Sequence, residues 1–340
     1  MPTITSKPTG PIGFGLMGFT WTPTPTPDAQ AFAAMSAALA GGANCWNAGE
    51  FYGMPGTRTA NLELLNRYFT AHPSDAAKVV LSVKGGADLT SDHLTSQGDR
   101  TGVRRSVENV LRVLDGKVFL SIFECARVDK NTPIEETVAA IAEFVKDGRI
   151  GGVGLSEVSP ETIRRAAKVH PIAAVEMEVS LWSREVFVPG GVADTCAELG
   201  IPIMAYSPLG RGILAGRFTK PEDLEDGDMR KIFDRFQPGN FEKNRVIVEN
   251  LDRIAERKGC SKAQVCLAWV LAQGNKPGKA TIVPLPGATG VDRVEENCKL
   301  VELSEEELEE VNGMMNEVDV HGGRYNEWMA PGSWEYFVGG

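Results

Sequence analysis

Short apolar runs alternate with amphipathic stretches along the whole chain. The clearest run is the Val-Val-Leu-Ser-Val segment at 79–83, and similar runs occupy 118–123, 150–155 and 201–206. Between such runs, apolar residues recur every three or four positions, for example over 103–114, as on the buried face of a helix. A repeated change from strand to helix is typical of parallel βαβ units, in which each helix returns the chain to the start of the next strand.

The complete pattern contains eight strands, each followed by a helix. We predict strands at 12–17, 44–47, 79–83, 118–123, 150–155, 172–176, 201–206 and 281–284. We predict helices at 28–40, 62–69, 103–114, 133–146, 159–168, 192–199, 242–258, 262–273, 291–299 and 304–317. No linker or shift in composition divides the chain. Eight βα units therefore predict an α/β fold, a single (β/α)8 TIM barrel domain over 1–340 with extra helices.

The segment after the last helix, 318–340, is rich in glycine and aromatic residues and has no clear periodicity. It is either a disordered terminus or a loop that lies across the barrel mouth. Its aromatic residues Trp328, Trp334, Tyr336 and Phe337 favour the second interpretation. We therefore expect a C-terminal tail over the mouth.

Charge and composition narrow the classes of function. The 340 residues carry a net charge of -10, which disfavours a nucleic-acid binder because phosphate backbones need a basic face. The first ten residues lack the apolar stretch of a secretion signal, and no apolar run is long enough to cross a bilayer. We expect a cytoplasmic protein that binds neither nucleic acid nor membrane, and the sequence leaves its oligomeric state open.

Cysteine and histidine give no sign of a metal site. The six cysteines are scattered without a C-x-x-C pair, and the four histidines show no H-E-x-x-H spacing. In a chain of this length without a secretion signal, such cysteines are typically reduced and buried. We therefore predict free thiols and no metal.

The segment Gly13-Phe-Gly-Leu-Met-Gly18 matches the G-x-G-x-x-G pattern of dinucleotide-binding proteins. That fingerprint must open a helix whose N-terminus faces the pyrophosphate. Here a Thr- and Pro-rich stretch at 19–27 follows instead, which cannot form that helix. We therefore reject a Rossmann fold and expect these glycines to turn the chain at the barrel mouth.

In a (β/α)8 barrel, catalytic residues gather at the C-terminal ends of the strands. Tyr52 follows the second predicted strand and Lys84 follows the third. An ammonium group beside a phenol favours the ionised phenol, so it lowers the pKa of the tyrosine and improves it as a proton donor. A lone tyrosine is usually structural and a lone lysine is usually solvated, so the pair gains weight only from this shared position.

The turn after the eighth predicted strand has the character of an anion site. The chain there passes from 284–289 into a predicted helix start at 290–297, with Arg293 in its first turn. Backbone N–H groups at a helix start, together with an arginine, can bind a phosphate. An ordinary βα loop is the alternative interpretation of this turn alone.

Taken together, these stretches resemble the aldo-keto reductase superfamily over nearly the whole chain. The resemblance rests on seven motifs in the family's order: Gly15-Leu-Met-Gly18, Asn47-Ala-Gly-Glu-Phe-Tyr-Gly53, Ser82-Val-Lys84, Arg127-Val-Asp129, Val153-Gly-Leu-Ser156, Tyr206-Ser-Pro-Leu-Gly210 and Pro286-Gly-Ala-Thr289 leading to Glu296-Asn297. The resemblance implies reduction of an aldehyde with a nicotinamide cofactor.

The family's catalytic group consists of Asp, Tyr, Lys and His, and the resemblance carries two of the four onto this chain unchanged. Tyr52 falls on the acid and Lys84 on its partner, whereas Asn47 stands at the Asp position and Ala126 at the His position. Asn47 can orient Lys84 but cannot neutralise it, so we expect more of the lysine's charge to act on Tyr52. Ala126 removes a second donor and enlarges the pocket. The sequence does not show whether Glu50 replaces the missing carboxylate near Lys84.

The resemblance also implies a set of cofactor-binding residues. They are Met17, Gly18, Ser156, Glu176, Tyr206, Ser207, Leu209, Gly210, Arg211, Gly287, Thr289, Arg293, Glu296 and Asn297. Among them, Ser156 falls on a partner of the nicotinamide carboxamide, and Tyr206 falls on the residue that stacks on the nicotinamide ring. Glu157 and Glu176 replace the family's Asn and Gln. Arg293 falls at the adenosine 2′-phosphate, so the cofactor expected is NADPH/NADP+ rather than NADH.

The departures from the family pattern resemble its fungal pyridoxal reductase branch, which implies reduction of pyridoxal to pyridoxine. The expected substrate-lining residues are Trp21, Phe51, Cys125, Ala126 and Arg127. Two alternatives remain open. The chain is a reductase of another aromatic aldehyde in secondary metabolism, or it is a non-catalytic NADPH-binding regulatory subunit. The intact pair of Tyr52 and Lys84 argues against the regulatory alternative.

Overall fold

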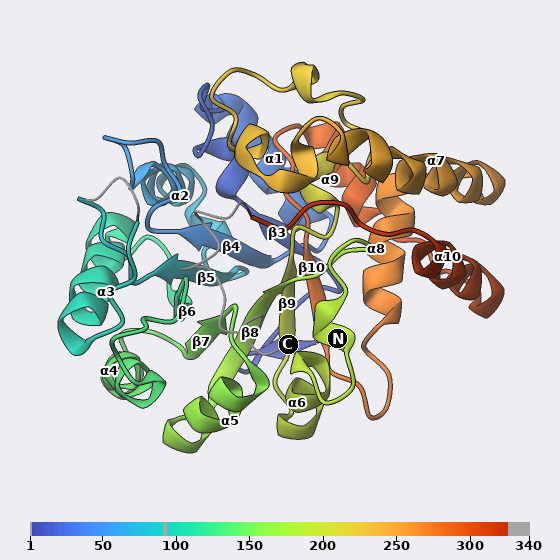
Figure 1. Cartoon of the computed structure of the whole chain (residues 1–340). Helices are drawn as coiled ribbons and strands as arrows, with labels where there is room; N and C mark the ends of the chain where they lie inside the picture. The colour runs from blue at the N-terminus through green and yellow to red at the C-terminus, as the bar shows by residue number, and fades with distance from the viewer. Residues whose placement is uncertain (1, 91–93, 326–340) are drawn as a thin grey trace.

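The computed structural model describes residues 2–90 and 94–325, and within them eight parallel strands form one sheet (Figure 1). The strands are β3 (Gly13–Gly15), β4 (Cys45–Gly49), β5 (Val80–Gly85), β6 (Leu120–Cys125), β7 (Val153–Ser156), β8 (Ile172–Glu178), β9 (Ile203–Tyr206) and β10 (Ile282–Leu285). Each strand pairs with the next in chain order. The sheet closes through a parallel bridge between Gly15 and Gly287, where the Gly15 N–H donates to the Pro286 carbonyl at 3.1 Å. The predicted (β/α)8 barrel is confirmed.

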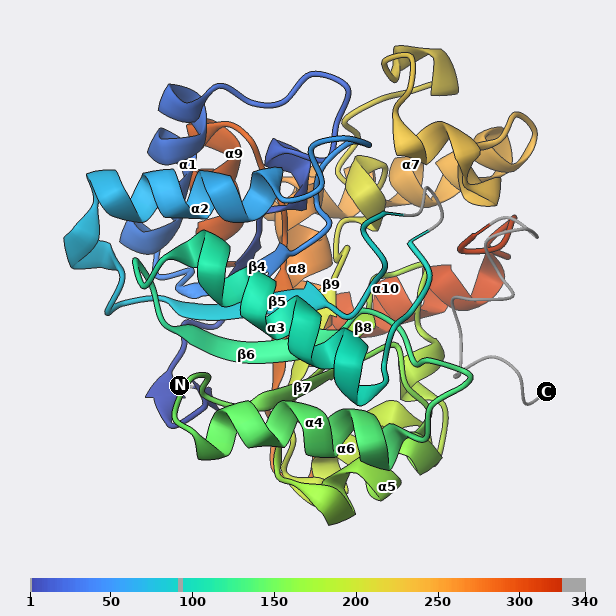
Figure 2. The same ribbon diagram turned by 90° about the vertical axis from the view of Figure 1, so that its left-hand side faces the viewer.

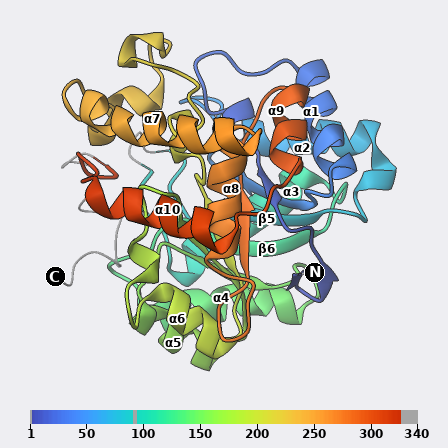
Figure 3. The same ribbon diagram turned by 90° about the vertical axis from the view of Figure 1, so that its right-hand side faces the viewer.

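Helices surround the strands as an outer layer. They are α1 (Asp28–Ala40), α2 (Ala60–Ala71), α3 (Arg100–Leu114), α4 (Ile134–Lys146), α5 (Pro160–Val169), α6 (Val192–Leu199), α7 (Asn240–Lys258), α8 (Lys262–Ala272), α9 (Val291–Cys298) and α10 (Glu305–Glu317). Figure 2 views the layer from the side of α2, α3 and α4, and Figure 3 from the side of α7, α8 and α10. The extra helices predicted from the sequence are therefore present.

Side-chain caps decide where several helices begin. Ser159 accepts from the Thr162 N–H at the start of α5, and Ser304 with Glu307 forms a capping box at the start of α10, as the sequence predicts. Helix α3 begins at Arg100, three residues before its first buried valine, because Asp99 accepts from two backbone N–H groups there. The apolar pattern alone therefore placed that boundary too late.

A short N-terminal hairpin closes the other end of the barrel, which the sequence did not predict. Its strands are β1 (Thr3–Ile4) and β2 (Lys7–Pro8). Ile4 is buried among residues at the beginnings of the strands, including Cys45 and Val80. The open, functional end of the barrel is therefore at the strands' C-terminal ends.

Two segments outside the regular units lie over that functional end. After β9, the chain runs through four short 3-10 turns between 210 and 236, and Phe218, Phe233 and Phe236 are buried there. The second segment follows α10. There, the backbone of His321 forms two hydrogen bonds of 2.9 Å with the side chain of Asn244 on α7. This contact leads the segment 318–325 back to β8 and β9 (Figure 1, dark red). The described part of the predicted tail, 318–325, therefore lies over the mouth, and the four aromatic residues on which the prediction rested lie outside the described residues.

Candidate active site

Lys84 is the centre of a buried polar cluster near the C-terminal end of β5. Its Nζ lies 3.2 Å from the Tyr52 hydroxyl and 3.3 Å from the Asn47 Oδ1. It also forms an ion pair with Glu176. All four side chains are almost completely buried. The structure thus brings together the three residues that the sequence assigned to catalysis, from β4, β5 and the loop after β4.

Glu176 changes the charge balance that we expected at this cluster. This glutamate, on β8, pairs with Lys84 through one carboxylate oxygen and accepts from the Asn47 Nδ2 at 2.6 Å through the other. Burial alone would lower the pKa of the Lys84 ammonium, but the negative charge of Glu176 raises that pKa above its usual value. The expectation that Lys84 lacks a neutralising carboxylate is therefore wrong, because β8 supplies the carboxylate that position 47 lacks.

Tyr52 carries its proton in this environment. Burial raises the pKa of the Tyr52 phenol, and the nearby charge of Lys84 opposes this effect without reversing it. The expectation of a lowered pKa is therefore wrong. Tyr52 is a neutral phenol beside a cation, an arrangement that can donate a proton and then stabilise the phenolate.

Glu124 is a second carboxyl group in the same region, and the sequence did not single it out. It is the register partner of Lys84 in the adjoining strands β5 and β6, and it is fully buried. Within the described chain, neither of its carboxyl oxygens accepts a hydrogen bond, and the Glu176 carboxyl group is close enough to share a proton with it. Burial raises the pKa of Glu124 well above its usual value, and the charge of Glu176 raises it further. Glu124 therefore holds its proton more tightly than an ordinary glutamate does.

Glu50 does not replace the missing carboxylate at Lys84. Its carboxylate is buried between three side chains of α3: Arg105 at 2.9 Å, Asn109 at 2.8 Å, and Ser106. Only its backbone N–H meets Lys84, donating to the lysine carbonyl at 2.7 Å. Glu50 therefore fastens the loop after β4 to α3 and leaves Lys84 to Glu176.

An apolar wall lies on one side of Tyr52. The ring centroids of Trp21 and Phe51 lie 5.5 and 5.3 Å from that of Tyr52. Ala126 packs against the same small cluster, where the family pattern has a histidine. Three residues assigned to substrate binding from sequence, Trp21, Phe51 and Ala126, therefore lie close to one another, and Cys125 adjoins them as the buried end of β6.

Arg127 brings a positive charge next to this wall. Its guanidinium donates to the Tyr325 hydroxyl at 2.9 Å and to the Ala126 carbonyl at 2.5 Å. In the part of the chain that the structure describes, no carboxylate forms an ion pair with it. The charge is therefore available to a ligand that carries an anionic or phenolic oxygen.

The residues expected to bind a nicotinamide lie at the ends of β7, β8 and β9. Lys84 Nζ lies 5.1 Å from the ring centroid of Tyr206, so the ring expected to stack on nicotinamide adjoins the catalytic lysine. Ser156 has a buried hydroxyl without a partner among the described residues. Glu157, Ser207 and Arg211 adopt left-handed backbone conformations with φ of 54°, 51° and 58°. Such strained residues are typical of functional sites.

The residues expected at the adenosine end also lie together. The chain around Gly287 and Thr289 meets β3 and the following turn, because Gly15 bridges Gly287 and Gly18 lies beside Thr289. The side chain of Asn297 is buried, and its Oδ1 lacks a partner within residues 2–90 and 94–325. The cluster can therefore accept a ligand with amide or amine donors.

A second arginine, which the sequence did not indicate, lies near Arg293. Arg217 forms an ion pair with Glu296 at 3.0 Å. Partial burial, and then the charge of Arg217, lower the pKa of Arg293. Two cations that repel each other beside a helix start form a suitable site for a phosphate.

The segment after α10 contributes to the nicotinamide side of the mouth. Arg324 forms buried ion pairs with Glu157 at 2.9 Å and Glu178 at 3.2 Å, and it donates to the Tyr206 hydroxyl at 3.1 Å. Burial would raise the pKa of Glu178, but Arg324 and Arg211 lower it to about 2. This cluster joins the tail to the strand ends, and sequence spacing gave no signal for it.

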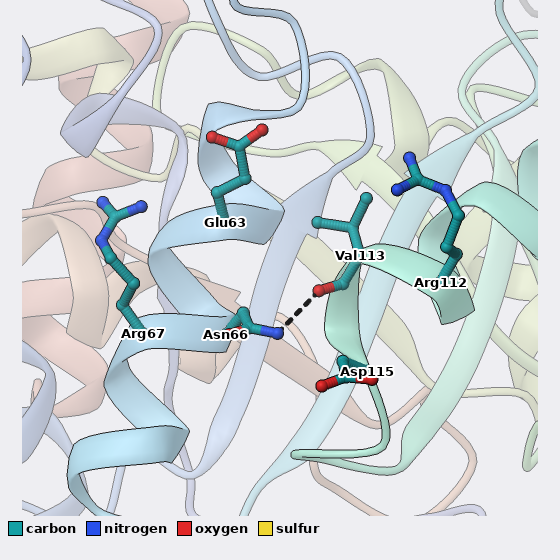
Figure 4. Close-up of a pocket in the computed structure, with 6 residues that line it drawn as sticks. All are labelled: Glu63, Asn66, Arg67, Arg112, Val113 and Asp115. Carbon is teal, nitrogen blue, oxygen red and sulfur yellow. Dashed lines mark hydrogen bonds between the residues drawn. The ribbon is translucent and has the colours of Figure 1, made fainter.

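A pocket in the helix layer and the cysteines lie apart from this site. An open pocket between α2 and α3 is lined by Glu63, Asn66, Arg67, Arg112, Val113 and Asp115, and Asn66 donates to the Val113 carbonyl at 2.9 Å (Figure 4). It lies in the helix layer, away from the strand ends. The six cysteines are free thiols, as predicted. Within the described ranges, no group of side chains could hold a metal ion, and no helix could span a membrane.

Comparisons with known proteins agree with this geometry. Residues 11–316 match the family described as Aldo/keto reductase family. The chain is 45% identical over 333 residues to "Probable pyridoxal reductase 2" of Schizosaccharomyces pombe, covering 96% of this chain and 98% of that protein. It is 35% identical over 335 residues to "Putative pyridoxal reductase" of Saccharomyces cerevisiae, covering 92% and 95%.

Solved structures show the same architecture. The glycerol dehydrogenase of Gluconobacter oxydans superimposes with a TM-score of 0.78 at 22% sequence identity, covering 93% of this chain and 94% of the other. At that identity the likeness concerns the fold alone. The match between the barrels therefore agrees with the strand order and closure described above.

Proposed function

Because this chain belongs to the aldo/keto reductase family and is an oxidoreductase, we propose that it reduces an aldehyde to an alcohol with NADPH, and that pyridoxal is its substrate. The observation that carries the proposal is the buried contact of 3.2 Å between the Tyr52 hydroxyl and the Lys84 ammonium. Tyr52 donates its phenolic proton to the carbonyl oxygen of the substrate. Lys84 then stabilises the phenolate that remains.

NADPH supplies the hydride when it is bound, and this chain offers suitable partners for it. The unpartnered hydroxyl of Ser156 suits the nicotinamide carboxamide, and the unpartnered Oδ1 of Asn297 suits the adenine amine. Arg217 and Arg293 suit a 2′-phosphate, which favours NADPH over NADH. The glycines at 18, 210 and 287 allow close approach of the backbone to the pyrophosphate.

The lining of the mouth supports an aromatic aldehyde. Trp21 and Phe51 offer flat apolar faces beside Tyr52, and Ala126 leaves room where a histidine would stand. Pyridoxal is a planar ring with a phenolic oxygen next to its aldehyde group. Arg127 can pair with that oxygen while the aldehyde faces Tyr52. Two relatives named as pyridoxal reductases support the same substrate.

The test is NADPH oxidation with pyridoxal against a panel of aromatic and aliphatic aldehydes, with Tyr52→Phe beside the unaltered protein. Removing a positioned proton donor is expected to lower kcat by roughly 100- to 10,000-fold. NADPH binding, followed by fluorescence, should persist in the variant. Turnover of other aldehydes without pyridoxal would overturn the substrate. No turnover of any aldehyde, with tight NADPH binding, would favour a regulatory subunit.

A further inference from the structure

We propose that Glu124 and Glu176 act as a pair of carboxyl groups that together hold one negative charge beside Lys84, in place of a carboxylate at position 47. Both are positioning residues that act on Tyr52 through Lys84. The inference rests on the proposed function, since it concerns the same proton donor. It differs from a simple loss of the aspartate, because the carboxylate has moved to another strand.

The geometry of the barrel interior supports the pair. Lys84 and Glu124 are register partners on β5 and β6, and Glu176 reaches Lys84 from β8. The intervening strand, β7, has Gly154 at the level of these carboxyl groups. A Cβ at Gly154 would lie 3.1 Å from a carboxyl oxygen of Glu124 and 2.7 Å from the side chain of Ile122. The glycine therefore leaves the interior space that the Glu124 carboxyl group needs, beside the strand that carries Glu176.

The charges permit only one ionised carboxyl group. Lys84 is the one cation that forms an ion pair with either glutamate in the described part of the chain. Two ionised carboxyl groups would leave an excess negative charge in a fully buried site. Glu176 has hydrogen-bond donors on both oxygens and Glu124 has none, so the charge belongs on Glu176 and the proton on Glu124.

The pair would tune how strongly Lys84 acts on Tyr52. The Lys84 ammonium forms an ion pair with Glu176 and a hydrogen bond with the Tyr52 hydroxyl. The same ammonium stabilises the Tyr52 phenolate after proton transfer. A neutral Glu124 keeps the total charge of the group at zero in the resting state. When Glu124 ionises, the added negative charge holds the Tyr52 proton more tightly, and catalysis slows.

The first experiment moves the carboxylate back to β4. Glu176→Gln alone should lower kcat at least about tenfold, because it removes one partner of a buried ion pair. Adding Asn47→Asp should restore most of that loss, since the new carboxylate faces Lys84 from the position that Asn47 occupies. An unchanged kcat in Glu176→Gln would overturn the proposal. A double variant no faster than the single one would do the same.

The second experiment concerns Glu124 and compares pH profiles. In the unaltered protein, kcat should fall as pH rises through the raised pKa of Glu124, and Glu124→Gln should abolish that decrease. Glu50→Gln is the matched control, because Glu50 is also a buried glutamate but bonds to α3 rather than Lys84. The control should keep the alkaline decrease. A decrease that persists in Glu124→Gln would overturn the proposal.

A third measurement is independent of turnover and separates this inference from the proposed function. At pH 7 the protein should show an infrared carbonyl band from a buried protonated carboxylic acid, and Glu124→Gln should remove it. The band can be present even if no aldehyde is reduced, in which case only the proposed function fails. Its absence in the unaltered protein would overturn the carboxyl pair.

Discussion

Two buried clusters of charge lie at the mouth of this barrel, and they are built in different ways. The strand cluster, Lys84 with Glu176, Glu124 and Asn47, takes every member from β4, β5, β6 or β8. The tail cluster, Arg324 with Glu157, Glu178 and Arg211, joins the ends of β7, β8 and β9 to the segment after α10. The strand cluster is therefore complete once the barrel closes, whereas the tail cluster also needs Arg324 from the segment after α10.

The difference shows that the barrel strands alone position the proton-donating part of the site, whereas the part beside Tyr206 also depends on the segment after α10. Neighbouring strands set the position of Lys84, which pairs with Gly49 on β4 and with Glu124 on β6. Arg324 is held by side-chain contacts, which include Glu157, Glu178 and Tyr206, the ring expected to stack on nicotinamide. Proton donation should accordingly tolerate changes in the tail better than cofactor binding does.

The largest effect is expected from Lys84→Met, which leaves Glu176 buried without its cation. Breaking a buried ion pair from one side costs roughly 3–5 kcal/mol, so the free energy of unfolding should fall by about that amount at pH 7.5. Activity should be lost as well. Urea denaturation measures the change. Unchanged stability would mean that the strand cluster contributes nothing to folding.

A smaller effect is expected from Arg324→Met in the tail cluster. Glu178 keeps Arg211 at 3.3 Å and Ser183 at 3.1 Å, and Glu157 still accepts from the Glu178 N–H at 2.9 Å, so we expect a loss of about 1–3 kcal/mol in the free energy of unfolding. The KM for NADPH should change more than kcat. The control is Arg67→Gln, which breaks an exposed ion pair with Asp28 and should change stability by less than about 1 kcal/mol. An effect on kcat alone would contradict the assignment of the tail to the cofactor side.

The two clusters should respond to pH in opposite directions. The folded-state pKa of Glu178 is lowered from 4.5 to about 2, so its stabilisation is full above pH 4.5 and is lost as pH falls toward 2. The pKa of Glu124 is raised, so the unfolded chain loses this proton first and stability decreases as pH rises above 4.5.

Each group should contribute at most about 1.4 kcal/mol per pH unit. Glu178→Gln should flatten the acid side of the stability profile, and Glu124→Gln should flatten the neutral side. Thermal unfolding from pH 3 to pH 8 measures both. If the two variants gave the same dependence of stability on pH, the opposite pH responses assigned to the two clusters would be wrong.

The smallest effect on folding is expected from Arg293→Ala, which lies outside both clusters. The side chain is exposed, so stability should not change measurably. The KM for NADPH should rise about tenfold while that for NADH stays the same, because one charged partner of the 2′-phosphate is lost. Equal changes for the two cofactors would refute the assignment of Arg293 to the 2′-phosphate.

The sequence predicted the barrel well because its strands are continuous apolar runs. Segments such as 79–83 and 201–206 fall on β5 and β9, and the glycines and caps between them fix most helix ends. The hairpin around Ile4 was missed because each of its strands has two residues, too short for a periodic signal. The start of α3 was missed because a cap set it rather than apolar residues.

The candidate site was predicted where consecutive strands supply the two residues, and it was missed where the contact joins strands far apart in the sequence. Tyr52 follows β4 and Lys84 lies in β5, so the strand order brings them together. Asn47 and Glu176 are 129 residues apart, and no local pattern shows that the carboxylate has moved between them. Glu124 lies inside an apolar run, where alternation alone cannot tell the barrel interior from the side facing the helices.

The hairpin at the N-terminus gives the molecule two ends with different uses. Ile4 is buried at the end of the barrel opposite Lys84 and the tail cluster. The hairpin therefore covers the barrel interior at the N-terminal ends of the strands. A surface or bead attached through residue 2 would therefore hold the protein with its mouth turned toward the solution. Immobilised in this way, the enzyme should bind aldehydes as freely as it does when dissolved.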